Sequence, residues 1–238
     1  MATSEPTIYV RRLDPNPGED VIQTVTDVMI KAFDGDHFTS MLVCDQLELV
    51  PDCHRAQIRA GLLAGEVWVA GFTPDDILGA AVWFGPGQEL LGGPNRKDQM
   101  ELGWKTFQAK LSEDGKRVWW RMFLGEYCTL ATNSLSRKHQ RPDSWKFDSW
   151  HLQLLGVIPE HQRKGLGRAL IEEIKKKADE QHLGMSVETE TEKSLRFYKG
   201  VGFVEQGNTI ITGYTDGSQP AKTSPMYCLS IDPDAKLA

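Results

Sequence analysis

The stretch Leu155-Gly-Val-Ile-Pro-Glu-His-Gln-Arg-Lys-Gly-Leu-Gly-Arg-Ala-Leu170 joins the end of an apolar strand to the start of a helix through a turn that contains two glycines. The strand begins near His151 and is bounded by Pro159, which cannot continue a β ladder. The helix is indicated by apolar residues at three- and four-residue spacing, namely Leu166, Ala169, Leu170, Ile174 and Ala178. These residues therefore predict a strand, a tight turn and an amphipathic helix in direct succession.

The turn between Gln162 and Gly167 has the chemistry of an anion-binding site. The first backbone N–H groups of a helix lack intrahelical acceptors and carry the positive end of its dipole. Glycine at 165 and 167 removes the Cβ atoms that would keep a diphosphate at a distance, and Arg163, Lys164 and Arg168 add positive charge. By itself, a pair of glycines two residues apart is weak evidence for a binding site, and its frequency favours a tight strand-to-helix turn. Neither a Walker loop nor the three-glycine dinucleotide fingerprint is present in the sequence.

The flanking segments predict a mixed α/β chain. After the helix, 185–190 reads as a strand, and a strand–helix–strand order with short connections implies a parallel crossover. A short helix over 193–199 and closing strands near 203–205 and 226–231 follow. The preceding part predicts a strand over 7–13, a helix from Glu19 to near Gly35, a helical stretch within 38–63 interrupted around Pro51, and a hairpin over 66–72 and 77–84.

Residues 86–149 form an aromatic-rich insertion in which we expect no strand. Its tryptophans are Trp104, Trp119, Trp120 and Trp145. Helical spacing within two sets of residues predicts two helices with aromatic faces, the sets being Trp104, Phe107 and Leu111, and Trp119, Phe123 and Tyr127. The polar stretch 137–144 is expected to be a loop. The length of 238 residues and the lack of a visible repeat favour a single domain over 1–238 with this insertion inside it.

The glycine turn, together with Tyr198-Lys-Gly-Val-Gly-Phe203, resembles the GNAT superfamily of acetyl-CoA-dependent N-acetyltransferases. The turn matches the family's [Gln or Arg]-x-x-Gly-x-[Gly or Ala] signature, and Tyr198 to Phe203 matches its Tyr-x-x-x-Gly-Phe element. The resemblance is firm over roughly 150–205 and extends to 7–84 through the order of strands and helices. It implies a mixed, mostly antiparallel sheet whose fourth and fifth strands, 150–158 and 185–190, run parallel and splay apart for the pantetheine arm.

The resemblance also assigns the cofactor-binding residues. Backbone groups of Leu155 and Val157 would pair with the pantetheine amides, and the amides of 163–168 would hold the pyrophosphate. The family often has asparagine where this chain has Thr191, which puts one side-chain contact to pantetheine in doubt. The expected acetyl-CoA contacts are Leu155, Gly156, Val157, Gln162, Arg163, Lys164, Gly165, Leu166, Gly167 and Arg168, with no metal.

Acetyl transfer to an amine needs a neutral attacking nitrogen and a proton for the departing thiolate. Tyr198 resembles the family's general acid, since a phenol of pKa near 10 can protonate a thiolate whose acid has a pKa of about 8.5; a ring packed in the core is the alternative. By two-residue alternation His151 shares a strand face with Leu155 and Val157, and it is a candidate base or simply a hydrogen-bonded histidine. Glu188 and Glu190 could orient an amine or act through water, or be surface carboxylates.

The aromatic insertion could close over the acceptor side of the cleft. A small satellite core, which would also use helix-spaced tryptophans, is the better explanation for most of them. Glu126 could be a surface group or an amine anchor.

Composition narrows the partners. Lys plus Arg is 27 against 33 Asp plus Glu, a net charge of −6, which lacks the basic excess of nucleic-acid binders. There is no run long and apolar enough for a membrane span, and the four scattered cysteines suggest neither a zinc site nor a disulfide framework, which favours the cytoplasm. The sequence is compatible with a homodimer. We expect an acetyltransferase acting on a small-molecule primary amine; the alternatives are a protein or peptide acetyltransferase and a noncatalytic acetyl-CoA-binding module.

Overall fold

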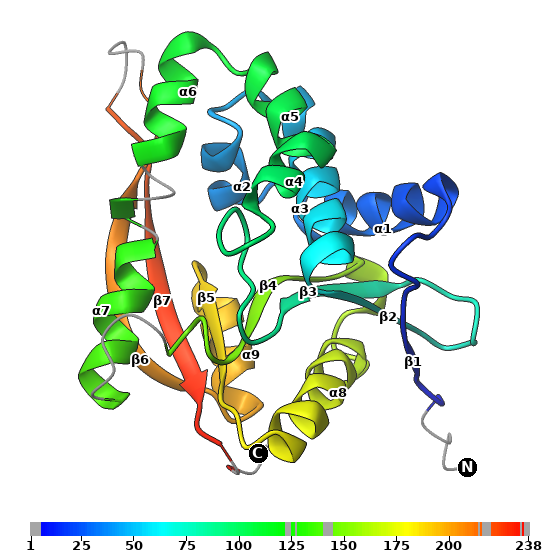
Figure 1. The fold of residues 1–238 in the computed structure, drawn as a ribbon. Coiled ribbons are helices and arrows are strands. Elements are labelled where there is room, and N and C mark those ends of the chain that lie inside the picture. Colours follow the sequence, from blue (N-terminus) through cyan, green and yellow to red (C-terminus); the bar gives the residue numbers. More distant parts are fainter. Residues whose placement is uncertain are drawn as a thin grey trace.

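A computed structural model describes residues 6–121, 125–126, 128–139, 145–213, 215, 220–233 and 235. Within these residues, a seven-stranded sheet has the order β1-β2-β3-β4-β5-β7-β6 (Figure 1). Neighbouring strands are antiparallel except β4 and β5, which run parallel, so the predicted mixed sheet is confirmed. The strands are β1 (Tyr9–Arg12), β2 (Glu66–Gly71), β3 (Gly79–Phe84), β4 (Trp150–Val157), β5 (Met185–Thr189), β6 (Val204–Thr212) and β7 (Thr223–Ile231).

The helices agree with the apolar periodicity of the sequence. Pro51 lies in the first turn of α3, where the missing N–H breaks no intrahelical bond, so it begins a helix instead of interrupting one as predicted. The helical elements are α1 (Glu19–Ala32), α2 (His37–Leu42), η1 (Leu47–Leu49), α3 (Val50–Ala64), α4 (Arg96–Gln99), η2 (Met100–Trp104), α5 (Lys105–Lys110), α6 (Glu113–Trp120), α7 (Cys128–His139), η4 (Pro159–His161), α8 (Leu166–Glu180) and α9 (Glu192–Gly200).

The sheet is covered on both faces. Alternate residues of β3 show the two layers, because Val82 packs with α1 and α3 whereas Trp83 packs with α8 (Figure 1). The first layer contains Val25, Met29, Ile58 and Leu154; the second contains Leu152, Leu170, Ile174 and Val187. Each large apolar side chain buried in this way contributes about 1.5–3 kcal/mol.

The insertion between β3 and β4 extends the first layer. Trp104 and Trp119 have ring centroids 5.4 Å apart, and Phe107 packs edge-on against Trp104 at 5.8 Å. All three are buried in the same cluster as α1 and α3, so these aromatic residues belong to the main core and not to a separate satellite. Phe123 and Tyr127, predicted to continue an aromatic helix face, lie outside the described residues.

The polar stretch 137–144 was predicted to be a loop. Residues 137–139 instead form the last turn of α7, and 140–144 lie outside the described residues. The earlier part of α7 supplies the apolar contacts that explain the helix, since Leu130, Ala131 and Leu135 are buried in the first layer of the core.

A β-bulge interrupts the regular pairing of β4. The register with β3 passes from Val82–Leu154 to Trp83–Leu152, so Gln153 is an additional residue with no partner of its own in β3. Each residue before the bulge is therefore displaced by one position relative to simple alternation.

This bulge changes the face on which His151 lies. His151 pairs with Phe84, which packs in the layer of α1 and α3, whereas Leu155 and Val157 pack in the layer of α8 and α9. The prediction that His151 shares a face with Leu155 and Val157 is wrong, because alternation with a period of two does not hold across a bulge.

The parallel ladder between β4 and β5 is short. It contains Trp150–Met185, His151–Ser186 and Leu152–Val187, and it stops there. Beyond that point β4 stays paired with β3 and β5 stays paired with β7, so the two strands diverge. The predicted splay of the fourth and fifth strands is confirmed.

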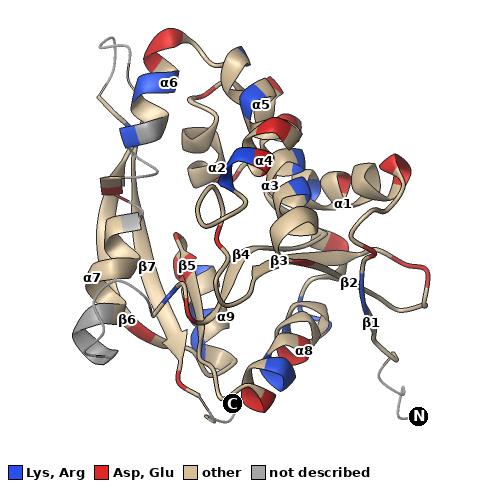
Figure 2. Ribbon diagram, in the orientation of Figure 1, with Lys and Arg blue, Asp and Glu red and all other residues tan. Residues whose placement is uncertain are grey.

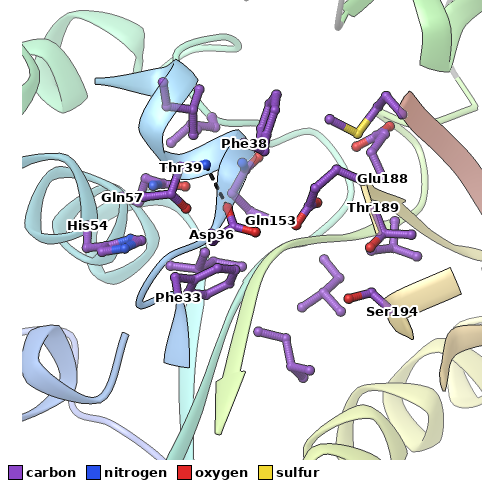
Figure 3. A pocket seen from close by; sticks show the side chains of 18 of the residues that line it. Phe33, Asp36, Phe38, Thr39, His54, Gln57, Gln153, Glu188, Thr189 and Ser194 are labelled. Carbon is purple, nitrogen blue, oxygen red and sulfur yellow. Dashed lines mark hydrogen bonds between the residues drawn. The ribbon is translucent and has the colours of Figure 1, made fainter. Parts of the chain in front are cut away.

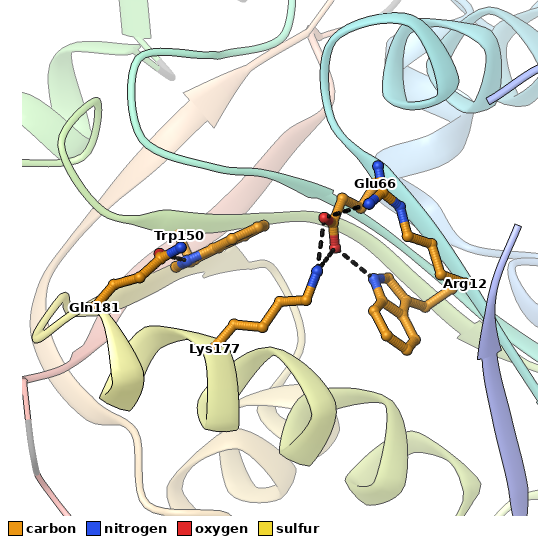
Figure 4. Close-up of polar contacts among 6 residues, drawn as sticks. Arg12, Glu66, Trp150, Lys177 and Gln181 are labelled. Carbon is orange, nitrogen blue, oxygen red and sulfur yellow. Dashed lines mark hydrogen bonds and ion pairs between the residues drawn. The ribbon is translucent and has the colours of Figure 1, made fainter. Parts of the chain in front are cut away.

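A polar cluster around Glu66 fixes α8 to the sheet (Figure 4). Both Glu66 carboxylate oxygens lie 2.7 Å from Lys177 Nζ, and one of them accepts from Trp68 Nε1 at 2.8 Å. Arg12 lies 3.0 Å from the same carboxylate. The Lys177 ammonium also lies 5.2 Å from the Trp68 ring and 5.6 Å from the Trp150 ring. The cluster thus connects β1, β2, β4 and α8.

Outside this cluster, charged residues occur on most of the helices, with both signs on α8 (Figure 2). Arg168 and Glu172, both more than two-fifths exposed, form an ion pair of the kind that contributes little to stability. Cys44, Cys53 and Cys228 are buried free thiols. Among the described residues, no helix is long and apolar enough to cross a membrane, and no group of His, Cys, Asp and Glu is arranged to hold a metal ion.

We expect Glu66→Gln to lower the free energy of unfolding by about 1–3 kcal/mol, because the amide that replaces one oxygen would face the donors of Lys177 and Arg12. Urea denaturation measures this. Glu113→Gln is the matched control: its side chain is 89% exposed and pairs only with Lys116 on the same helix, so a change within about 0.5 kcal/mol is expected. Equal effects of the two substitutions would contradict a special role for Glu66.

Candidate active site

A pocket occupies the gap between the diverging strands. The empty space within it, counted out to its open mouth, is about 920 Å³. Side chains from both layers of the core line it, so the gap opens toward both faces of the sheet. From the side of α8 and α9 come Leu155, Ser194 and Tyr198; from the side of α1 and α3 come Phe33, Asp36 and His54 (Figure 3).

The backbone of β4 presents polar groups to this gap. The amide of Ile158 donates to the carbonyl of Leu78 at 3.0 Å, on the β3 side. Since successive peptide groups of a strand point in opposite directions, those of Leu155 and Val157 point toward the gap. The Val157 carbonyl accepts a hydrogen bond from Gln162 Nε2 at 3.1 Å, which anchors the first residue of the glycine turn to the end of β4.

The glycine turn leaves the first amides of α8 without intrahelical acceptors. Gly165 has a φ of 88° and Arg163 a φ of 60°, so the chain reverses through two left-handed residues before Leu166 begins the helix. The amide of Ala169 donates to the carbonyl of Gly165 at 2.9 Å, which is the first bond of the regular helical pattern. The amides that precede it lie at the N-terminus of the helix, which is a general location for anion binding.

Two of the predicted cofactor-contact glycines have packing roles. A Cβ atom at Gly156 would lie 2.8 Å from both Ala32 and Met29, so this glycine allows α1 to approach β4. A Cβ atom at Gly167 would lie 3.3 Å from the Phe197 ring, so this glycine allows α8 to approach α9. Gly156 therefore has its open side against α1 and not toward the gap.

Tyr198 lies on the wall of the pocket and is also packed. Its ring contacts Phe197 and Phe203 edge-on, at centroid distances of 5.1 and 5.6 Å, and the residue is only 6% exposed. Burial, followed by the charge of Glu190, raises the pKa of its hydroxyl, so the phenol keeps its proton. Thr191, where the family often has asparagine, caps α9 by accepting a hydrogen bond from the amide of Ser194 at 3.0 Å.

His151 belongs to a buried polar network. Its Nδ1 lies 3.0 Å from Ser186 Oγ, and its Nε2 lies 3.2 Å from a Glu188 oxygen without hydrogen-bond geometry. Lys146 Nζ lies 3.1 Å from both oxygens of Glu188, whose side chain is fully buried. Burial and the Lys146 charge lower the pKa of His151 to about 3, although Glu188 opposes this. Because its pKa is so low, the His151 imidazole is neutral near pH 7 and holds a proton only weakly.

Glu190 and Asp36 form an acidic pair in the same pocket. Burial, together with the negative charge of Asp36, raises the pKa of Glu190 to about 7. Asp36 precedes α2, and its carboxylate accepts from the amide of Thr39 at 2.6 Å (Figure 3). The sequence analysis missed Asp36; an aspartate just before a short helix is a signal for a cap and not for a site.

The insertion contributes one wall of the pocket through Leu90, Trp104 and Trp119. These residues are thus part of both the core and the candidate site. Glu126 lies elsewhere: its carboxylate accepts from the amide of Thr212 at 2.6 Å, so it satisfies the backbone of β6 and does not line the pocket.

The mixed sheet with splayed parallel strands, followed by a glycine turn at the start of a helix, is the arrangement that the sequence resemblance implied. Residues 137–215, about a third of the chain, match the family model of the acetyltransferase (GNAT) domain. Over this region the chain is similar to the GNAT superfamily.

An uncharacterized N-acetyltransferase of Schizosaccharomyces pombe is 26% identical over 155 residues, which are 65% of this chain and 57% of that relative. Among solved structures, a mosquito arylalkylamine N-acetyltransferase like 5b has a TM-score of 0.61 at 15% identity, with 98% of this chain and 100% of that chain covered. The Drosophila melanogaster polyamine N-acetyltransferase, which forms N-acetylagmatine, has a TM-score of 0.57 at 17% identity, with 95% and 100% covered. These structures share the fold.

The pKa of Glu190 gives a pH-dependent prediction. Its folded value of about 7 lies above the ordinary 4.5, so the stability it contributes is full below pH 4.5 and is lost as the pH rises through 7. Glutamine cannot ionise. The difference in unfolding free energy between Glu190→Gln and the wild type should therefore shift in favour of the variant by about 1–3 kcal/mol as the pH rises from about 5 to about 8. Urea denaturation at each pH measures this difference. The exposed Glu180→Gln should show no such gain, and a flat difference for Glu190→Gln would contradict the shifted pKa.

Proposed function

We propose that the protein transfers the acetyl group of acetyl-CoA directly to the primary amine of a small molecule. The observation that carries this proposal is the pocket in the β4–β5 gap, which opens toward both faces of the sheet. Its lining includes residues of β4 and Tyr198 on one side, and carboxylates and aromatic walls under α1, α3 and the insertion on the other.

In this proposal acetyl-CoA lies along the open side of β4. The backbone groups of Leu155 and Val157 pair with the pantetheine amides, and the amides of 163–168 hold the pyrophosphate. Gln162 keeps the turn in place through its bond to Val157. The exposed side chains of Arg163 and Lys164 add positive charge near the phosphates.

The chemistry requires proton transfers at the nitrogen and at the sulfur. The acceptor ammonium first gives a proton to a carboxylate, and Glu190, with its pKa of about 7, is the proposed recipient, directly or through water. The neutral nitrogen then attacks the thioester carbonyl carbon, the carbon–sulfur bond breaks, and the thiolate takes a proton from the Tyr198 hydroxyl. The second proton that the nitrogen loses as the amide forms returns to Tyr198 through water. His151 pairs with Ser186 and is not proposed as the base, while Lys146 holds Glu188 in position.

The lining of the pocket favours a cationic acceptor. Asp36, Glu188 and Glu190 contribute carboxylates, and no Lys or Arg is among the described residues that line it. The nearby Lys146 offsets Glu188, which leaves Asp36 and Glu190 to attract an ammonium group. The walls of Trp104 and Trp119 enclose the pocket, which suits a small molecule better than a peptide. Two structural neighbours are named for amine acceptors, in agreement with this reading.

The test is release of CoA thiol from acetyl-CoA in the presence of small amines, polyamines and lysine-containing peptides. We expect turnover with small amines, and Tyr198→Phe should lower kcat about 100-fold or more while the Kd for acetyl-CoA stays within about 2-fold. The exposed Tyr9→Phe is the control. Turnover with peptides alone would identify a peptide acetyltransferase, and acetyl-CoA binding without any thiol release would identify a noncatalytic module.

The pyrophosphate contact has a separate test. Any side chain at Gly165 would strain a backbone with a φ of 88°, so charge reversal of the exposed neighbours is a cleaner change. The double substitution Arg163→Glu/Lys164→Glu should raise the Kd for acetyl-CoA about 10-fold or more at low salt, and the loss should shrink as salt is added. The exposed Lys176→Glu on α8 is the control for net charge. Unchanged affinity in the double variant would remove these side chains from the phosphate site.

A further inference from the structure

His54 on α3 is a buried polar residue with an unusual surrounding. It is 2% exposed, and neither ring nitrogen has a hydrogen-bond partner among the described residues. Its ring packs against Phe33 at a centroid distance of 5.4 Å and lines the pocket. In Figure 3, His54 and Gln57 extend from α3 toward the pocket, with Asp36 between them and Ser194 in this view.

A buried imidazole lowers the stability of a protein unless its nitrogens form hydrogen bonds. Burial without partners disfavours the charged form and lowers the pKa of His54 to about 4, so the ring is neutral near pH 7. A neutral imidazole offers one N–H donor and one acceptor nitrogen. A leucine or phenylalanine would fill the same space without leaving polar atoms unpaired. The unpaired nitrogens therefore point to a partner that arrives with the substrate.

Two further polar groups lie on the same side of the pocket. Gln57, one turn along α3, makes a long contact of 3.8 Å from its amide nitrogen to Cys53 Sγ. The indole N–H of Trp104 is buried and has no hydrogen-bond partner among the described residues. We call His54, Gln57 and Trp104 the polar recess; Phe33 forms an apolar wall beside it.

The chemistry of the recess selects the group that it can bind. The Trp104 indole and one nitrogen of His54 can only donate, and so can an ammonium group. A second ammonium group would therefore leave both of these donors unpaired. A carboxylate would be repelled by Asp36 and Glu190 and would meet no Lys or Arg in the lining. A hydroxyl group both donates and accepts, and it is uncharged, so it can pair with either the donor or the acceptor nitrogen of a neutral imidazole.

We propose that the polar recess binds a hydroxyl group of the acceptor, so that the preferred acceptors are primary amines that carry a hydroxyl group at the end remote from the nitrogen. This inference rests on the proposed acetyltransferase function. Asp36 and Glu190 attract the ammonium end, and His54 accepts or donates at the hydroxyl end.

The test uses pairs of ligands in which only the hydroxyl differs. Each straight-chain amino alcohol in a series of increasing length is matched with the alkylamine in which methyl replaces hydroxyl. Calorimetry gives the Kd of each for the full-length protein saturated with CoA. At one length in the series, the wild type should bind the amino alcohol about 10-fold more tightly than its methyl match.

The variant His54→Phe should abolish this preference, leave the Kd of the alkylamine within about 2-fold, and raise Tm by a few degrees, because an unpaired buried polar ring is removed. His54→Leu gives the same reading if phenylalanine is too large to fold in. The exposed His37→Phe, outside the pocket, should change none of these. Absence of any preference in the wild type, or a preference retained in both His54 variants, would overturn the proposal.

This experiment separates the two proposals. If no amine releases CoA thiol, the proposed function fails, while the calorimetric preference still measures the recess. If amines are acetylated but wild-type protein binds both members of every pair equally, the recess fails and the acetyltransferase stands.

Discussion

The early end of the β4–β5 ladder is the constraint on which the rest of the structure depends. A sheet normally satisfies the backbone groups of an interior strand on both sides, and leaving them unpaired in the interior is costly. Here the pairing stops at Leu152 and Val187, although β4 continues to Val157 and β5 to Thr189. The resulting gap exposes strand backbone at the centre of the molecule and allows a ligand to take the place of the missing strand contacts.

The elements around the gap are held by interactions outside it. Glu66, Lys177 and Arg12 connect α8 to the edge of the sheet, and Gly156 lets α1 lie directly on β4. These contacts fix α8 and α1 to the sheet on either side of β4. The site itself is built from features that do not favour stability, namely a buried Glu190 with a raised pKa and an imidazole without partners at His54. A binding site typically contains groups that lower the stability of the fold, and contacts elsewhere in the structure compensate for them.

The two faces of the sheet supply different parts of the site. The face covered by α8 and α9 carries the glycine turn and Tyr198, whereas the face covered by α1, α3 and the insertion carries Asp36, His54 and the aromatic walls. Because Trp104 and Trp119 are also core residues, the shape of the site on the side of α1 and α3 depends on how the insertion packs. Substrate selection in this protein is therefore expected to change with the insertion, and cofactor binding with the glycine turn.

The sequence by itself determined the local elements: alternation and helical spacing predicted the strands, α1 and α8, and the glycine turn with Tyr198 indicated the family. Those signals are short-range, so they survive without knowledge of the fold. The sequence could not reveal the bulge at Gln153, which places His151 on the other face of β4. Nor could it reveal the burial that lowers the pKa of His151 and raises the pKa of Glu190. Asp36 and His54 could not be predicted as site residues either. A capping aspartate and a histidine within a helix come to line a pocket only when segments far apart in the chain pack together. Only the tertiary structure decided these points, since burial, register and charge coupling depend on contacts between residues far apart in the chain.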